Sequence, residues 1–468
     1  MMATPTNARN AQTQIQRTNG TGTETGPTLP VDARWVERLS RARGEPDWLL
    51  RWRLERLHQA ETLPMPGSRY TRIRGLKLHE IEPLALDSAS ASTPTPAPNA
   101  GLERALGERV ERGRAEAAGV YALLDGSVVS CELEESLRRR GVLWLDVAQA
   151  VREHPELVRR ALEQLPEPRD RVTALGRALF TSGLFVYVPK GVEVERPLRA
   201  VYAMTRPGAG LFTQSALIVE EGSSVTLLEE HTSLETEPFE RRAVHAGELA
   251  VVVGPGARAS VAGVQGLNAR LYQFIRRRAR VQRDGQLAWA LGWLGGRLTM
   301  SHVETVLDGP GAEVDDVQVF FTAGRQHVDL TSNLIHSKPH TRGEVNVKGV
   351  LKGQSQAVFW GLIRIDPGAQ GANAFQAERS LLLERGPKSN AIPSLEILAN
   401  DVRCTHAAAT SPVDEEQLFY LRSRGLDEDE AKKLIVDGFF EPTIEKIPLP
   451  LVQTELRLLL DRKWQEEL

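Results

Sequence analysis

The chain has 468 residues and a formal net charge of -3, with 58 Lys and Arg against 61 Asp and Glu. Its 41% hydrophobic and 25% charged residues are typical of globular proteins, and its length suggests two or three domains. The missing basic excess argues against a protein that wraps nucleic acid. No apolar run approaches the roughly 18 residues of a membrane-spanning helix. We therefore expect neither nucleic acid nor a membrane as a partner.

The first 30 residues are rich in Thr, Asn, Gln and Gly and lack the apolar segment of a signal peptide. We expect residues 1–30 to form a disordered tail, although Arg9 and Arg17, with no early acidic residue, faintly resemble a transit peptide. Two cysteines, Cys131 and Cys404, are too few for a disulfide framework. These features favour a cytoplasmic location.

Residues 31–174 are predicted to form an N-terminal helical region. Pro46 suits the first turn of a helix, apolar residues follow it at helical spacing, and the Pro-rich segment 63–67 ends the pattern. Residues 87–100 are a low-complexity Ser, Ala and Pro linker. Helical periodicity returns over 139–165.

Residues 175–412 are predicted to form an all-β core. Short β-rich runs recur between Gly, Pro, Asn and Asp residues, at 184–188, 216–219, 224–228, 249–253, 314–321 and 361–365. A sandwich, a barrel and a solenoid all fit such runs. No strict repeat is visible, so all three architectures stay open. The length of the region favours the solenoid without deciding the matter.

The final segment, 413–468, is predicted to be a C-terminal helical domain. Asp414 caps a first helix, and Asp427 caps a second that closes at Gly438. A third follows Pro450. The second helix opens with four acidic residues, which would repel phosphates, so partner docking is a better use of these helices than DNA reading.

The motifs of phosphate-binding loops, dinucleotide sites, zinc proteases and serine hydrolases are missing, which is evidence against nucleotide hydrolysis by this chain itself. As a separate expectation, the chain catalyses no reaction alone. The sharpest chemical signal is the segment 401–406. On a strand, Cys404 and His406 would share one face, and thiolate with imidazole can bind iron, zinc or an iron–sulfur cluster. Two ligands make half a site, which another segment or chain must complete. The alternative is a buried free cysteine beside a hydrogen-bonded histidine.

His327, His336 and His340 form a second histidine group. Pro339 argues against a helix that would place the last two on one face. Solvated or hydrogen-bonding histidines in a β region are the simpler interpretation.

Long and unusual motifs resemble the SufB/SufD family of iron–sulfur assembly proteins. The resemblance spans about residues 175 to 445 and rests on Gly183–Val192, Lys348–Leu351, Ala357–Gly361, Pro393–Ile397, Asn400–His406 and Asp414–Gly425. It implies a mainly β fold with a right-handed parallel β-helix core, flanked by N-terminal and C-terminal α-helical domains. It also implies a complex of SufB, SufD and the ATPase SufC.

Within that family the chain is most similar to SufD. SufB proteins commonly carry a cysteine in a Gln-Cys-Asp element, and the matching residues here are Gln376-Ala377-Glu378. The N-terminal segment 45–66 is also similar to SufD. The family usually has Ser-His-Gly-Ala-Thr where this chain has His406 followed by three alanines. Because the glycine is lost, the resemblance does not fix the local backbone conformation.

A SufD-type subunit implies a shared site in which His406 and Cys404 contact iron or a nascent cluster at the interface with SufB. No cofactor would then be bound stably by the chain alone, and a homodimer is an expected form in isolation. The resemblance places SufC on the C-terminal helices, with contacts expected from Leu418, Phe419, Leu421, Arg422, Arg424 and Leu434. The alternatives are a SufB-like scaffold that holds a cluster itself and a β-helix carbohydrate-active enzyme.

Overall fold

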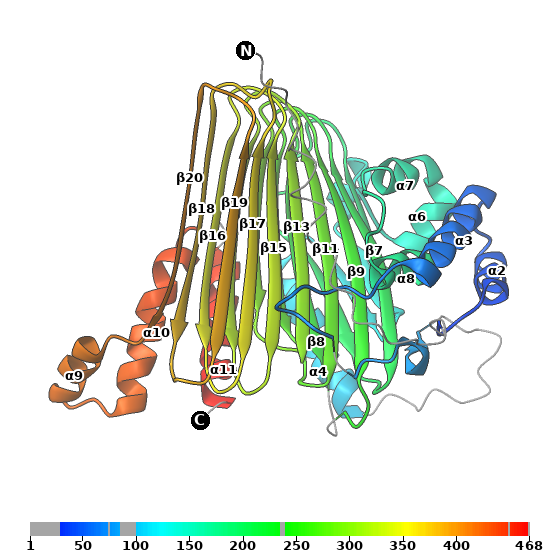
Figure 1. The fold of residues 1–468 in the computed structure, drawn as a ribbon. Coiled ribbons are helices and arrows are strands. Elements are labelled where there is room, and N and C mark those ends of the chain that lie inside the picture. Colours follow the sequence, from blue (N-terminus) through cyan, green and yellow to red (C-terminus); the bar gives the residue numbers. More distant parts are fainter. Residues whose placement is uncertain (1–28, 74, 85–99, 235–238, 448–449, 467–468) are drawn as a thin grey trace, which may run out of the picture.

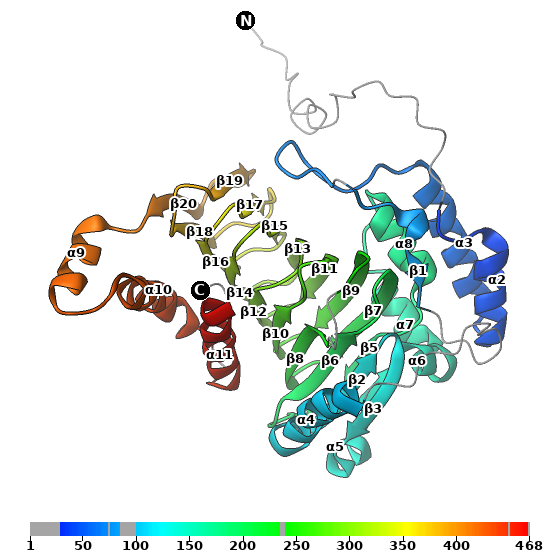
Figure 2. The same cartoon turned by 90° about the horizontal axis from the view of Figure 1, so that it is seen from below.

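The computed structural model describes residues 29–73, 75–84, 100–234, 239–447 and 450–466. The predicted tail lies outside these residues up to residue 28, and the predicted linker up to residue 99. The described residues form two ten-stranded sheets, and from β5 onward the chain alternates between them, with odd-numbered strands in one and even-numbered strands in the other (Figure 1, Figure 2). From β5 onward, each strand pairs in parallel with the strand two places along the chain. The predicted parallel β-helix, here of about eight turns, is confirmed.

The strands have the following bounds. The odd sheet contains β1 (Glu82–Pro83), β5 (Leu184–Val188), β7 (Ala209–Val219), β9 (Ala243–Val253), β11 (Leu271–Val281), β13 (Leu298–Leu307), β15 (His327–His336), β17 (Gln356–Ile365) and β19 (Lys388–Ile397), together with β4 (Leu143–Asp146). The even sheet contains β2 (Gly119–Leu124), β6 (Leu198–Met204), β8 (Ser224–Ser233), β10 (Arg258–Gly266), β12 (Gln286–Trp293), β14 (Glu313–Thr322), β16 (Arg342–Leu351), β18 (Ala372–Leu382) and β20 (Val402–Pro412), together with β3 (Ser127–Leu133).

The strands show two burial patterns. In β15 and β17, buried and half-buried residues alternate over most of the strand, because one face points into the β-helix and the other toward the surface. In β7 and β9 every residue is buried, because α7 (Pro155–Leu162) and α8 (Arg171–Leu179) also cover their outer face. Both patterns supply one continuous apolar interior, which includes Val251, Leu307 and Ile365.

Helices flank the β-helix at both ends of the sequence, as predicted (Figure 1). The remaining ones are α2 (Ala33–Ala42), α3 (Asp47–Thr62), the 3-10 turn η2 (Leu78–Glu80), α4 (Ala100–Glu116), α5 (Glu135–Arg139), α6 (Val147–Glu153), α9 (Glu415–Ser423), α10 (Glu428–Ile444) and α11 (Pro450–Glu466). The breaker after α3 acts where predicted, since the helix ends at Thr62. Among the described helices, none combines the length and apolar character needed to cross a membrane.

The helical prediction for 31–174 leaves out three strands that cap the first coil. β2 and β3 form an antiparallel hairpin whose turn residues, Asp125 and Gly126, have positive φ angles of 46° and 84°. β2 also pairs in parallel with β6, and β4 pairs antiparallel with β5. Trp144 and Leu137, each 4% exposed, pack in the interior at this end. The N-terminal end of the β-helix is therefore closed.

The C-terminal helices pack against the even sheet. The Asp414 carboxylate accepts from the backbone of Glu416 and Gln417, and Asp427 completes the predicted capping box with Glu430. The predicted end of the second helix at Gly438 is wrong, since α10 continues to Ile444. Further along this helix, Phe440 and Ile444 are 1% exposed, and both pack in the apolar cluster between the helices and the even sheet. Burial of this last turn outweighs the helix-breaking preference of glycine.

Candidate functional site

The last coil of the β-helix leaves one edge of each sheet unpaired. Within the described chain, β19 pairs only with β17, and β20 pairs only with β18. Figure 2 shows these two strands at one end of the β-helix, beside the connection to α9. From Thr405 to Pro412 every residue of β20 is exposed. Because an unpaired edge presents free backbone donors and acceptors, this end is a template for pairing with another chain.

Cys404 and His406 lie on this edge strand, two residues apart. Their placement on a strand, with the side chains on one face, agrees with the sequence prediction. Cys404 pairs with Ala374 of β18, is half-buried and packs against the apolar interior. Burial raises the pKa of its thiol, which favours the protonated form until a cation is near. His406 pairs with Gln376 and is exposed, so its imidazole is available to a partner.

The neighbouring strand β18 carries two residues of the Gln376-Ala377-Glu378 element whose burial the sequence did not predict. Gln376 is 1% exposed, and neither atom of its side-chain amide has a hydrogen-bond partner in the described chain. Glu378 is 2% exposed; it accepts a hydrogen bond from Ser380, while its other oxygen has no partner. Burial raises the Glu378 pKa to about 7, although the Ser380 bond opposes this. Only the strand register reveals that Gln376 lies opposite His406 and that Glu378 lies opposite Ala408.

The open end therefore gathers a thiol, an imidazole and a carboxyl group. These donors suit a borderline or soft metal such as iron. Among the described residues, however, no three His, Cys, Asp or Glu side chains come together in a way that could hold a metal ion. Cys404 and His406 thus remain a predicted half-site, and further ligands would have to come from outside the described chain.

The second histidine group is not gathered into one site. His327 exchanges a hydrogen bond of 2.9 Å with the Thr71 hydroxyl, and His336 one of 2.8 Å with Thr341. Burial lowers the pKa of both imidazoles to about 4, so both are neutral at physiological pH. His340 occupies a tight turn with a positive φ of 57°. These roles are structural.

A second surface lies where α9 and α10 leave the β-helix. It is an open hollow of about 840 Å³ lined by Tyr420, Leu421 and Leu434, among others. Phe419 is 75% exposed and Leu434 is 52% exposed, which is unusual for large apolar side chains. Tyr420, 56% exposed, belongs to the same surface and was missed by the sequence analysis.

The other residues predicted to dock a partner have different environments. Leu418 is only 8% exposed and packs inside the helical cluster, so we assign it to the core and not to the contact surface. Arg422 lies 3.8 Å from Glu428. Arg424 stacks on the Tyr420 ring at 5.1 Å. Both arginines thus lie beside the exposed apolar residues.

Family models match most of the chain. Residues 202–439 match the SufBD core domain of the SUF system for FeS cluster assembly, and residues 117–200 match the SufBD protein N-terminal region. The second match covers β2 to β4, the strands that close the N-terminal end. The two models together cover both ends of the β-helix.

Individual relatives resemble the chain over nearly its full length. The iron-sulfur cluster assembly protein SufD of Bacillus subtilis is 32% identical over 94% of this chain and 99% of its own. An iron-sulfur cluster assembly SufBD family protein of Staphylococcus saprophyticus is 30% identical over 91% of each chain. The protein SufB of Bacillus subtilis is 29% identical, again over 91% of each chain.

Proposed function

Because the chain belongs to the SufBD family of iron–sulfur cluster assembly proteins, we propose that it is the SufD-type subunit of a cytoplasmic complex with SufB and the ATPase SufC. The observation that carries this proposal is the unpaired strand β20 with Cys404 and His406 on it. A SufB chain of the same family would offer a matching edge. Pairing of the two edges would bury the polar groups of both end coils.

The shared site would take iron or a nascent cluster as cargo. Cys404 and His406 would supply two of about four ligands, and SufB would supply the others. On this proposal the chain alone holds no cofactor and catalyses no reaction. Because the thiol is protonated when half-buried, iron binding would release its proton. In the absence of SufB, two copies of this chain would pair through the same edges.

SufC would dock on the hollow beside α9 and α10. Tyr420 and Leu434 line the hollow and would supply an apolar centre. The exposed Phe419, with Arg422 and Arg424, lies on or at the end of α9 beside it. An apolar centre with a charged rim is typical of a specific protein interface. ATP-driven movement of SufC would then reach the shared site through the connection between β20 and α9.

A replacement of His406 tests the shared site. The chain is co-expressed with SufB and SufC, the complex is purified, and its cluster is measured by visible absorbance. We expect His406→Ala to assemble normally but to reduce cluster yield at least about tenfold, because one ligand is lost. Thr405→Ala is the matched control, since Thr405 is equally exposed on the opposite face of the strand. Normal yield from the His406 variant would remove the proposed role.

A charge in the apolar hollow tests the docking surface. We expect Leu434→Asp to weaken SufC binding at least about tenfold, because an unpaired carboxylate would be buried at the contact. Val129→Asp is the control, because Val129 is 56% exposed on β3, away from the hollow. Equal effects of the two changes would argue against docking at this surface.

The similarity to SufB supports one second candidate, a scaffold that binds a cluster by itself. The absence of a thiol at Gln376-Ala377-Glu378 counts against it. Reconstitution of the isolated chain with iron and sulfide decides between the two. A stable cluster on the isolated chain would favour the scaffold.

A further inference from the structure

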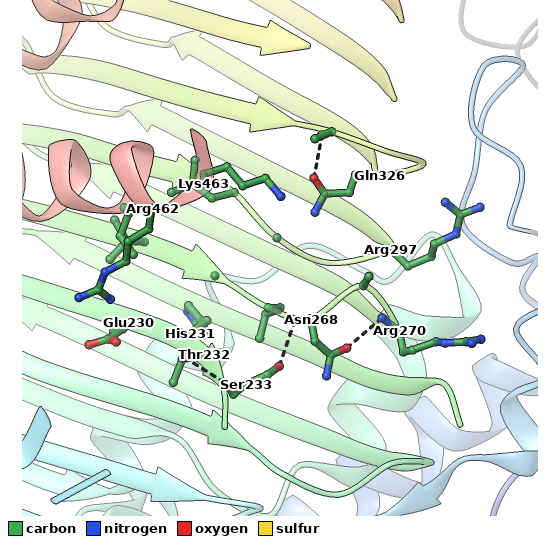
Figure 3. A pocket seen from close by; sticks show the side chains of 18 of the residues that line it. Glu230, His231, Thr232, Ser233, Asn268, Arg270, Arg297, Gln326, Arg462 and Lys463 are labelled. Atoms are coloured by element: carbon green, nitrogen blue, oxygen red, sulfur yellow. Dashed lines mark hydrogen bonds between the residues drawn. The ribbon is translucent and has the colours of Figure 1, made fainter. Parts of the chain in front are cut away.

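A pocket of about 1100 Å³ lies at the side of the β-helix, away from the residues discussed so far. Its walls are α4, α11, the end of β8, and the turns that lead from β10 to β11, β12 to β13 and β14 to β15. Figure 3 shows Arg462 and Lys463 entering from α11, with Asn268, Arg270 and Arg297 on the turns across from them. The lining residues thus come from segments far apart in the sequence.

Four arginines occupy equivalent positions in successive coils along one side of this pocket. Arg242, Arg270 and Arg297 each immediately precede a strand of the odd sheet, and Arg325 lies in the turn before the next strand. The strands they precede are hydrogen-bonded neighbours. Adjacent strands lie about 4.8 Å apart, so the four turns stack positive charges on one another. Like charges at such spacing repel unless a counter-charge is present.

Among the described residues, the acidic side chains that line the pocket are too few to balance this charge. Eight basic and three acidic side chains line the pocket. Arg109 and Arg112 are balanced, because they pair with Glu230 and Glu455 at 2.8 and 3.3 Å. Four other lining arginines make no ion pair within the described part of the chain, namely Arg270, Arg297, Arg325 and Arg462. The pocket therefore carries a surplus of positive charge.

One buried polar atom at the pocket wall also lacks a partner. Asn268 accepts a bond from the Arg270 backbone at 2.9 Å, but its buried amide nitrogen has no hydrogen-bond partner in the described chain. Unsatisfied buried groups are costly, and a ligand that accepts hydrogen bonds would relieve this cost.

We propose that this pocket binds a small phosphate-bearing molecule of nucleotide size. Guanidinium groups match phosphate oxygens in charge and geometry, and the Asn268 amide adds a donor. Val264, Leu294 and Leu459 form an apolar wall beside the arginines, which suits the organic part of such a ligand. The concave shape favours a small ligand over a nucleic acid or an acidic protein, each of which would contact a broad surface. This site is independent of the proposed cluster site.

Calorimetric titration of the purified full-length chain with inorganic pyrophosphate, ADP and sulfate tests the proposal. We expect both phosphate compounds to bind at one site and sulfate to bind at least tenfold more weakly. Tighter binding of ADP than of pyrophosphate would support use of the apolar wall, and equal binding would support recognition of phosphate alone. Absence of binding by both compounds, or equal binding of sulfate, would overturn the proposal.

Variants locate the binding. The double change Arg270→Gln and Arg297→Gln is expected to weaken pyrophosphate binding at least tenfold. Asn268→Asp keeps the bond to the Arg270 backbone but adds a negative charge, and should weaken binding to a similar degree. The control is Arg34→Gln with Arg38→Gln, which removes two exposed charges from α2 and should change nothing. Unchanged binding in both pocket variants, with circular dichroism showing a folded protein, would refute the site.

Discussion

The buried Glu378 gives a sharp test of the end coil. Its pKa is raised from 4.5 to about 7 because burial disfavours the carboxylate. In the unfolded chain the same carboxyl loses its proton near pH 4.5. As the pH rises from 4.5 to 7, the folded protein keeps a proton that the unfolded chain releases, so stability falls over this window. Above pH 7 the loss is complete and the stability no longer depends on this group.

The magnitude follows from the difference in pKa. Each tenfold difference in proton affinity corresponds to about 1.4 kcal/mol, so the full loss is about 3 kcal/mol. Glu378→Gln keeps the shape and the oxygen that accepts from Ser380, but it cannot ionise. The variant should therefore match the wild type near pH 4.5, exceed it by about 1 kcal/mol at pH 5.5, and exceed it by about 3 kcal/mol at pH 8.5.

Urea unfolding of the isolated chain at the three pH values measures these differences, and hydrogen exchange of β18 amides localises them to the last coil. Glu384→Gln is the control, because Glu384 is exposed nearby and should change stability by less than about 0.5 kcal/mol at every pH. If the difference between wild type and the Glu378 variant were the same at pH 4.5 and 8.5, the assignment of a raised pKa would be wrong.

Three further predictions concern the stability of the fold. Gly349→Ala should cost about 1–3 kcal/mol in thermal unfolding, because an added Cβ would lie 1.8 Å from the buried Phe320 ring; an unchanged melting temperature would contradict the packing. Arg177→Met should cost about 3–5 kcal/mol, because it leaves Glu248 buried without its partner at 2.6 Å, and Arg177→Met with Glu248→Leu should recover most of that loss. Asp427→Ala should cost about 1 kcal/mol, because it removes the capping box of α10, whereas Asp427→Asn should cost little.

The sequence correctly predicted the strands and helix starts whose signals lie within a few neighbouring residues. The run Leu184–Val188 coincides with β5, and the caps at Asp414 and Asp427 begin α9 and α10 as expected. In contrast, the hairpin of β2 and β3 was missed although its Asp125-Gly126 turn is a local signal. The pairing of β2 with β6, about 80 residues away, has no local signal. The end of α10 was misplaced because tertiary burial of Phe440 outweighs a local glycine signal.

The candidate site was predictable only in part for the same reason. Cys404 and His406 share a face through the period of one strand, which the sequence displays. The position of Glu378 beside this strand depends on the register between β18 and β20, which β19 separates along the chain. The arginine-lined pocket was harder still to predict from the sequence. Its residues come from several coils, so they can be placed together only when the coil period is known. No strict repeat reveals that period, because the coils differ in length.

The closed N-terminal end has a consequence for how large an assembly can become. A stack of parallel coils with two open ends would add further molecules at each end and grow into a fibre. Here β3 and β4 run antiparallel to their neighbours, and Trp144 fills the interior at that end. Each molecule thus has one end with parallel edge strands, which can continue the coil, and one end whose edge strands, β3 and β4, run antiparallel and cannot continue it. When two molecules join through their open ends, neither has a joining end left, so polymerisation ends at the pair.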